Sequence, residues 1–264
     1  MLEIHELSMN YGGVQALTNV SMVFSPGKIT GIIGPNGAGK TTLFDAVTGF
    51  VRPSQGQVTL DGTRIDGQRP SRIARRGLVR TFQEVRVFDG LTVADNIYVA
   101  KQARRYRNVF RDGSRRRRKD DATLTAELPH MGSLATRLAD YPPDLSFGER
   151  KRLEYVRLLA SGAHALLLDE PASGLDADAL ADLGEIMQDA ASKGAVVCVI
   201  EHNMDFVLDV CDYVYVLHLG ELLAHGPAAH VLANEDVRRV YLGRERLNEG
   251  ETAPTVTSPL ETRG

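Results

Sequence analysis

No apolar stretch of the sequence is long enough to cross a membrane. A spanning helix needs roughly 18 consecutive apolar residues, and none of the apolar runs reaches that length. The first ten residues, MLEIHELSMN, contain two glutamates and lack the pattern of a signal peptide. We therefore expect that any role at a membrane is carried out through attached partner chains.

Cysteine is scarce, and neither sign of charge is in large excess. Cys198 and Cys211 are too few for a disulfide framework, which suggests a reducing compartment. Both lie in apolar stretches, so we predict buried structural thiols. The 31 basic and 34 acidic residues give a net charge of -3, which provides no general attraction to nucleic acid.

The chain has enough apolar residues to form a sizeable core. Its 264 residues are 43% hydrophobic, which suffices for one domain or for a domain with a subdomain. Alternating apolar and polar residues in 2–9 and 19–24 predict half-buried, antiparallel strands, and Asp61-Gly62 predicts a hairpin. From about residue 92 to 145 the pattern becomes helical and charged.

Short apolar runs alternate with helical patterns in much of the chain. Buried strands are predicted at KITGII, HALLLDE, GAVVCVIEH and YVYVLHLG, which are residues 28–33, 164–170, 194–202 and 213–220. Helices are predicted from about Lys40, from Ser146, and at about 177–191 and 203–211. Strands and helices in this alternation predict an α/β fold with a mostly parallel sheet and helices on both faces.

A glycine-rich segment, GPNGAGKTT at 34–42, follows the first of these strands and precedes a helix. It fits the phosphate-loop pattern G-x-x-x-x-G-K-[ST] in the context that this motif requires. Glycines let the backbone curl so that N–H groups point at phosphate oxygens, and the helix start adds its positive dipole end. Lys40 supplies a cation for the β- and γ-phosphates, and Thr41 a hydroxyl for Mg²⁺. The residues that we assign to nucleotide binding here are Asn36, Gly37, Ala38, Gly39, Lys40, Thr41 and Thr42.

Two acids, Asp169 and Glu170, end another of the predicted buried strands. Ligands of parallel sheets bind at the carboxyl ends of the strands. There Asp169 is placed to hold magnesium, and Glu170 to orient and polarise an attacking water. The alternative is a strand that ends in solvated acids without a ligand. A glutamate at this position favours hydrolysis over binding alone.

The segment LSFGE, residues 145–149, begins a helix in an unusual way. Ser146 and Glu149 have the spacing of a capping box, in which each side chain bonds the backbone N–H of the other residue. Gly148 nevertheless stands in the first turn, where glycine costs about 1 kcal/mol relative to alanine. A helix N-terminus is a ready anion site, and a glycine there lets another group approach the backbone closely.

Seven elements follow one another in an order that resembles the nucleotide-binding subunit of ABC transporters over about residues 2–243. They are Tyr11, the phosphate loop, Gln83 in RTFQEVRVF, LSFGE, LLLDE, SGLD at 173–176 and His202 in VIEHNMD. The resemblance implies a P-loop NTPase ABC cassette with a mostly parallel core sheet, an antiparallel β subdomain and an α-helical subdomain. It implies a nucleotide-binding domain at 1–243, with the helical subdomain at about 84–162. Residues 244–264 are polar and are expected to form a flexible tail.

The resemblance also implies a role for each matched residue. Tyr11 would stack on adenine, Gln83 would reach the magnesium and the attacking water, and His202 would bond the γ-phosphate. Ser146 and the amides around Gly148 would contact the γ-phosphate bound by a second cassette packed head to tail, with Asp176 at the interface. Asp176 is also suited to cap the helix that follows it. Simpler alternatives are a core or turn tyrosine, a surface glutamine and a strand-end histidine.

The LSFGE segment departs from the family pattern at two positions. The family usually has glycine where Phe147 stands and glutamine where Glu149 stands. A carboxylate about 8 Å from a triphosphate oxygen costs roughly 1 kcal/mol at an effective dielectric near 40. We expect the three basic residues that follow, Arg150 to Arg152, to offset this charge.

Several stretches are most similar to the ATP-binding subunit of high-affinity branched-chain amino acid importers, above all IEHNM and the terminal VYLG. This similarity implies ATP and Mg²⁺ as cofactors, and as partners a second cassette (identical or a sister chain), permease subunits and, indirectly, a solute-binding protein. It implies a peripheral place on the cytoplasmic face of the inner membrane, and no nucleic-acid partner is expected. The alternatives are a urea or short-amide importer and a regulatory cassette that does not hydrolyse ATP.

A basic run, Arg115 to Lys119, stands in the charged helical region near four further arginines, Arg104, Arg105, Arg107 and Arg111. A solvated loop is the favoured interpretation of this run. The alternative is contact with anionic lipid headgroups, where each charge adds about 1 kcal/mol.

Overall fold

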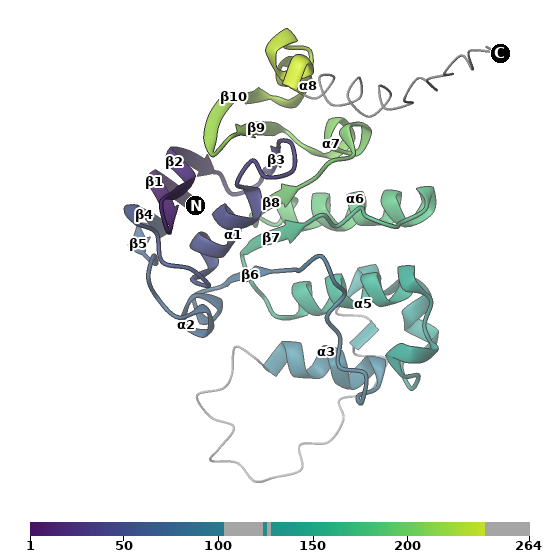
Figure 1. Cartoon of the computed structure of the whole chain (residues 1–264). Helices are drawn as coiled ribbons and strands as arrows, with labels where there is room; N and C mark the ends of the chain where they lie inside the picture. Colours follow the sequence, from purple (N-terminus) through teal and green to yellow (C-terminus); the bar gives the residue numbers. More distant parts are fainter. Residues whose placement is uncertain (103–123, 126–127, 241–264) are drawn as a thin grey trace, which may run out of the picture.

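The computed structural model describes residues 1–102, 124–125 and 128–240, and within them the chain forms two sheets, one in the middle of the molecule and one at its left-hand side in Figure 1. The first sheet is antiparallel, as predicted, with the strand order β2-β1-β4-β5. Its strands are β1 (Leu2–Tyr11), β2 (Val14–Phe24), β4 (Gln55–Leu60) and β5 (Thr63–Arg64). The predicted hairpin at Asp61-Gly62 joins β4 to β5. β1 and β2 both extend beyond their predicted bounds. Their pairing contains register shifts, and such irregularities break the regular alternation of apolar and polar residues from which strands are predicted.

The second sheet has the order β10-β9-β3-β8-β7-β6 and is parallel except for β10, which pairs antiparallel with β9. Its strands are β3 (Ile29–Ile33), β6 (Leu78–Arg80), β7 (Ala165–Asp169), β8 (Val196–Ile200), β9 (Tyr213–His218) and β10 (Glu221–Pro227). The predicted mostly parallel sheet is confirmed. The two edge strands, β6 and β10, were not predicted, since β6 has only three residues and β10 is largely exposed.

Helices cover both faces of this sheet. On one face α1 (Lys40–Thr48) lies between the two sheets, where Leu43, Phe44 and Val47 share a core with β1, β7 and β8. On the other face α6 (Ala177–Ser192) and α7 (Met204–Val210) bury Leu183, Ile186 and Phe206 in a second core. α2 (Pro70–Arg75) precedes β6, and α8 (Ala228–Leu232) follows β10. Cys198 and Cys211 are buried, as predicted, and burial raises the pKa of the Cys211 thiol to about 12.

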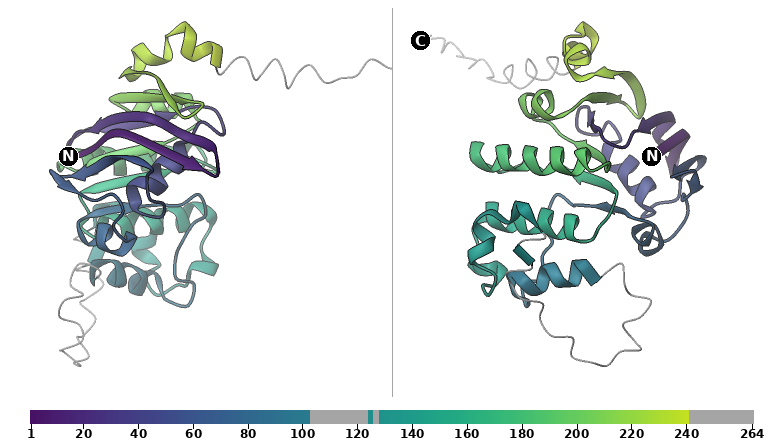
Figure 2. Two further views of the ribbon diagram at one scale, coloured as in Figure 1. Left: turned by 60° about the vertical axis from the view of Figure 1, so that its left-hand side comes forward. Right: turned by 180° about the vertical axis from the view of Figure 1, so that it is seen from behind.

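A separate group of helices lies at the end of the molecule farthest from β10 and α8 (Figure 2). It consists of α3 (Val93–Gln102), η3 (Pro129–Thr136), η4 (Pro142–Asp144) and α5 (Phe147–Ala160). These elements share a third core that includes Ile97, Leu134 and Leu153. Among the described residues of the region predicted to be helical, 93–102, 129–136 and 142–144 are helical, as predicted. The arginines at 104–111, the basic run at 115–119 and the tail at 244–264 lie outside the described residues. None of the described helices is long and apolar enough to cross a membrane.

Candidate nucleotide-binding and hydrolysis site

The phosphate loop connects β3 to α1, and two of its glycines are required by the packing around them. Gly34 has φ +154°, and a Cβ there would lie 2.1 Å from the carbonyl oxygen of Leu217. Gly39 has φ +102°, and a Cβ there would lie 2.7 Å from the carbonyl oxygen of Ala16. Only glycine fits such positions without moving the backbone. The loop is therefore held tightly against β9 and β2.

Lys40 begins α1 and points back into the loop. Its side chain is buried, and Nζ donates hydrogen bonds to the carbonyl oxygens of Gly34 at 2.6 Å and Pro35 at 3.0 Å. Gly39 occupies the N-cap position and has no side chain to cap the first N–H groups of the helix. The ammonium and the uncapped helix start together make a positively polarised site. Around it, Asn36, Gly37 and Thr41 are exposed, Thr42 is half-buried and Ala38 is buried.

Asp169 ends β7 and is only 2% exposed. Its Oδ2 accepts a hydrogen bond from Arg80 at 2.7 Å, and its N–H donates to Thr81 Oγ1 at 3.1 Å. Its Oδ1 is buried and has no hydrogen-bond partner among the described residues. Burial raises the pKa of Asp169, although the Arg80 guanidinium acts in the opposite direction. An orphaned buried carboxylate oxygen requires an explanation, and a hard cation such as Mg²⁺ fits it.

Glu170 and His202 lie next to each other at the ends of β7 and β8. His202 Nε2 is 2.9 Å from Glu170 Oε1, and the Glu170 N–H donates to the Ile200 carbonyl at 2.9 Å. The Glu170 backbone has φ +47°, a left-handed conformation that is uncommon outside glycine. Both side chains reach solvent, since 26% of Glu170 and 38% of His202 are exposed. The structure therefore brings together the carboxylate and the imidazole that the sequence singled out.

Tyr11 and Gln83 are both exposed on the surface of the protein. Tyr11 is the last residue of β1 and is 47% exposed. Gln83 is exposed in the loop after β6, three residues beyond Arg80. Both side chains are therefore open to contact from outside the chain.

The start of α5 has the predicted capping box. Ser146 Oγ accepts from the Glu149 N–H at 3.3 Å, and Glu149 Oε2 accepts from the Ser146 N–H at 2.9 Å. Burial raises the pKa of Glu149, but hydrogen bonds from Ser146 and Arg137 outweigh it and hold the pKa below its usual value. The partner that balances this charge is Arg137 at 2.8 Å, rather than Lys151 or Arg152.

Lys151 and Arg152, two of the basic residues after Glu149, face other parts of the protein. Lys151 turns into the protein, and Arg152 pairs with Asp182 of α6. Lys151 is two positions from Glu149, and residues two apart on a helix do not face one another. Arg152 is three positions on and shares a helix face with Glu149, but its guanidinium pairs with Asp182 instead. The expectation that they offset its charge is therefore not met by Lys151 or Arg152.

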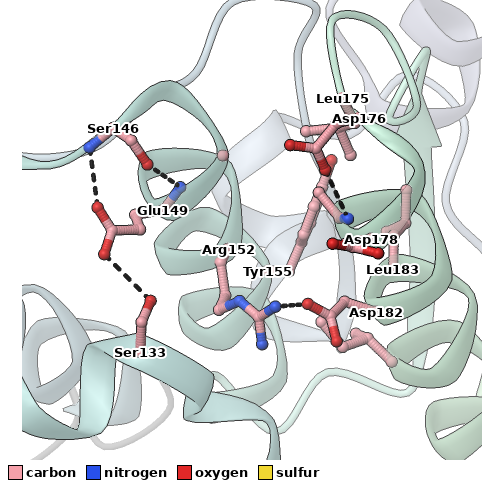
Figure 3. Close-up of a pocket in the computed structure, with 13 residues that line it drawn as sticks. Ser133, Ser146, Glu149, Arg152, Tyr155, Leu175, Asp176, Asp178, Asp182 and Leu183 are labelled. Carbon is pink, nitrogen blue, oxygen red and sulfur yellow. Dashed lines mark hydrogen bonds and ion pairs between the residues drawn. The ribbon is translucent and has the colours of Figure 1, made fainter.

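Ser146, Gly148 and Asp176 line one pocket of about 220 Å³ between the starts of α5 and α6 (Figure 3). Asp176 caps α6, as predicted, because its Oδ1 accepts from the Ala179 N–H at 2.9 Å. The Arg152–Asp182 ion pair crosses the pocket. The residues lining this pocket do not include the phosphate loop. The predicted site residues therefore fall into two groups. Ser146, Gly148 and Asp176 line this pocket, and the others lie outside it.

Comparison with known proteins identifies what these two groups belong to. A family model described as "ABC transporter" matches residues 17–173, more than half of the chain. The ATP-binding protein LivG of Escherichia coli K12, named for high-affinity branched-chain amino acid transport, is 36% identical over 252 residues. That match covers 92% of this chain and 98% of LivG. The chain belongs to the ABC transporter family.

Three further comparisons refine this placement within the ABC family. A model described as "Branched-chain amino acid ATP-binding cassette transporter" matches residues 221–246, and BraF of Pseudomonas aeruginosa is also 36% identical, with 92% of this chain and 98% of BraF covered. The solved ADP conformation of MJ1267, an ATP-binding cassette of an ABC transporter, superposes with a TM-score of 0.79. That structure is 27% identical, and the match covers 92% of this chain and 98% of MJ1267. Like other ABC cassettes, this one is an ATPase that works as a dimer with transmembrane permease subunits.

Sequence reasoning missed two residues that hold the cassette site together. Arg80 bridges α1 and β7, with Asp45 at 2.5 Å and Asp169 at 2.7 Å. Glu201 is 3% exposed, and its carboxylate accepts hydrogen bonds from the N–H groups of Ala172 and His202. In both cases the sequence shows a charged residue in or beside an apolar strand. It does not show the residue that pairs with this charge, because the order of the strands in the sheet cannot be read from the sequence.

Proposed function

We propose that this cassette hydrolyses ATP to power the import of branched-chain amino acids. The match of residues 221–246 to the branched-chain family model carries this proposal, because it lies outside residues 17–173, which the general ABC transporter model matches. The names of LivG and BraF support the same cargo. The cassette would sit on the cytoplasmic face of the inner membrane, beneath permease subunits that receive solute from a binding protein.

The geometry supports a specific division of labour around the triphosphate. Lys40 and the first N–H groups of α1 would bind the β- and γ-phosphate oxygens, with the Tyr11 ring against the adenine. Thr41, Asp169 and Gln83 would hold Mg²⁺, which supplies charge neutralisation to the phosphate oxygens when bound. Glu170 would accept the proton of the attacking water while the water oxygen bonds to the γ-phosphorus and the bond to the β-phosphate oxygen breaks. His202, in contact with Glu170, would bond the γ-phosphate.

The second group, Ser146, Gly148 and Asp176, would act on a nucleotide held by the other cassette of the dimer. A Cβ built on Gly148 meets nothing within 4 Å, so no packing among the described residues explains a glycine there. The capping box leaves Gly148 at the second position of α5, where its N–H is not bonded within the helix. That arrangement suits close approach of a phosphate from outside the chain.

Replacing Gly148 with alanine tests this assignment, because folding and activity should change in opposite directions. The helix should gain up to about 1 kcal/mol of unfolding free energy, because alanine is the better helix former. ATP hydrolysis by the assembled transporter should nevertheless fall about tenfold, as the methyl group obstructs the partner's phosphate. Gly90 is the matched control, since a Cβ there also meets nothing within 4 Å. Normal hydrolysis by Gly148→Ala would contradict the trans assignment.

Cargo is tested by uptake in cells that lack the gene for this chain. We expect uptake of labelled leucine, isoleucine and valine to be lost and to return with the wild-type chain but not with Lys40→Ala. Uptake of urea and acetamide, measured in the same cells, is expected to stay unchanged. Loss of urea or acetamide uptake with normal leucine uptake would replace the proposed cargo with small amides.

A further inference from the structure

The segment that carries Glu170 has a backbone conformation that its surroundings must maintain. Glu170 has φ +47° and precedes Pro171, and a proline disfavours helical conformations in the residue before it. Such a conformation costs roughly 1–3 kcal/mol and persists only where the surrounding structure enforces it. The contacts that enforce it here are therefore also the contacts that direct the Glu170 carboxylate.

Two side chains of α5 hold the residue directly after Glu170. The Tyr155 hydroxyl donates to the Pro171 carbonyl at 2.8 Å, and Lys151 Nζ donates to the same oxygen at 3.4 Å. Lys151 is 2% exposed and Tyr155 is 3% exposed. Burial lowers the pKa of Lys151, while nearby carboxylates, including Glu154 and Glu170, act in the opposite direction. A cation buried this deeply is costly, so its position next to the Glu170 segment needs a reason.

The same segment is held on its other sides as well. The Ala172 N–H donates a hydrogen bond at 2.7 Å to the carboxylate of Glu201, the residue that directly follows β8. The ring of Phe147, in the first turn of α5, packs against Gly174, where a Cβ would lie 3.0 Å from Cε1. Helix α5 therefore contacts this loop at both Pro171 and Gly174. The turn that faces the second cassette and the turn that holds Pro171 belong to one rigid helix.

We propose that Lys151 and Tyr155 are positioning residues for ATP hydrolysis, which hold the Pro171 carbonyl and thereby direct the Glu170 carboxylate. When the start of α5 docks on the nucleotide of the other cassette, the displacement of the helix reaches Glu170 of its own chain through these two hydrogen bonds. Each cassette would thus align its own catalytic carboxylate only when it has engaged its partner. This inference rests on the role proposed above for Glu170.

Tyr155→Phe tests the proposal, because it removes one donor and keeps the buried ring. In the transporter assembled from the full chain and its permease, we expect kcat for ATP hydrolysis to fall about fivefold, with KM within about twofold. Lys151→Met should lower kcat in the same way, and Lys151→Arg should restore most of it. Tyr141→Phe is the matched control, since Tyr141 is 47% exposed, and both constants should stay unchanged.

A double-mutant cycle separates positioning from a general effect on the fold. If Tyr155 acts through Glu170, then in the Glu170→Gln background Tyr155→Phe should change the residual rate less than about twofold. A fivefold loss in both backgrounds, or lower stability with normal kcat, would overturn the proposal. If Glu170→Gln alone leaves hydrolysis intact, the proposed catalytic role of Glu170 is wrong. That outcome differs from one in which Glu170→Gln abolishes hydrolysis but Tyr155→Phe acts independently of it, which would overturn only the positioning role.

Discussion

Replacing Arg80 with methionine should lower the free energy of unfolding by about 3–5 kcal/mol, the usual cost of leaving one partner of a buried ion pair alone. The Arg80 side chain is 5% exposed and lies between Asp45 and Asp169, and its guanidinium stacks over the rings of Phe44 and Phe82. Methionine fills much of the same space but carries no charge. The Asp169 carboxylate, 2% exposed, would then be buried without a counter-charge.

Urea denaturation without nucleotide measures this effect, and Arg64→Met provides the matched control. Arg64 also pairs with an aspartate, Asp66, at 2.8 Å, but its side chain is 63% exposed. Exposed pairs of this kind contribute about 0–1 kcal/mol, so the control should unfold almost like the wild type. Equal, small losses in both variants would show that Arg80 does not stabilise the buried Asp169.

The parts of the site that the sequence predicted are those built from neighbouring residues. The phosphate loop, the Asp169-Glu170 pair and the Ser146–Glu149 capping box each depend on a few consecutive positions and on one adjoining strand or helix. The same holds for the Asp176 cap on α6. Local chemistry determines such features, so a short pattern is enough to find them.

The parts that could not be predicted depend on which strands and helices become neighbours. Arg80 meets Asp169 because β6 pairs with β7, although 89 residues separate them. Glu201 reaches Ala172 because β8 pairs with β7. The counter-charge of Glu149 was expected from the residues that follow it, yet Arg137 supplies it from the helical region before α5. In each case the sequence shows a charge but not its partner.

The edge strands were missed for a related reason. β6 has three residues, too few to establish alternation, and β10 lies at a sheet edge where most of its side chains are half-buried or exposed. In β1 and β2, positive φ angles at Glu6 and Asn19 accompany the register shifts that interrupt the alternation. Tertiary pairing stabilises these segments even though their local patterns are weak.

Exchanging Glu170 for glutamine should reduce ATP hydrolysis about 100-fold or more, since an amide cannot accept the proton of the attacking water. The change is nearly isosteric, and the amide oxygen can keep the contact with His202 Nε2, which is 2.9 Å from Glu170 Oε1. ATP binding should therefore persist, as measured by equilibrium dialysis. Glu185→Gln, on the exposed side of α6, is the matched control and should hydrolyse ATP normally.

The same Glu170→Gln variant also shows which chain completes the site. If Ser146 and Gly148 act on the nucleotide of an identical chain, light scattering should find dimers with Mg-ATP and monomers without it. Normal hydrolysis would exclude Glu170 as the base. Monomers under both conditions, with ATP bound and hydrolysis lost, would mean that the start of α5 docks on a sister cassette or only within the assembled transporter. Adding the neighbouring cassette and then the permease subunits would separate these two cases.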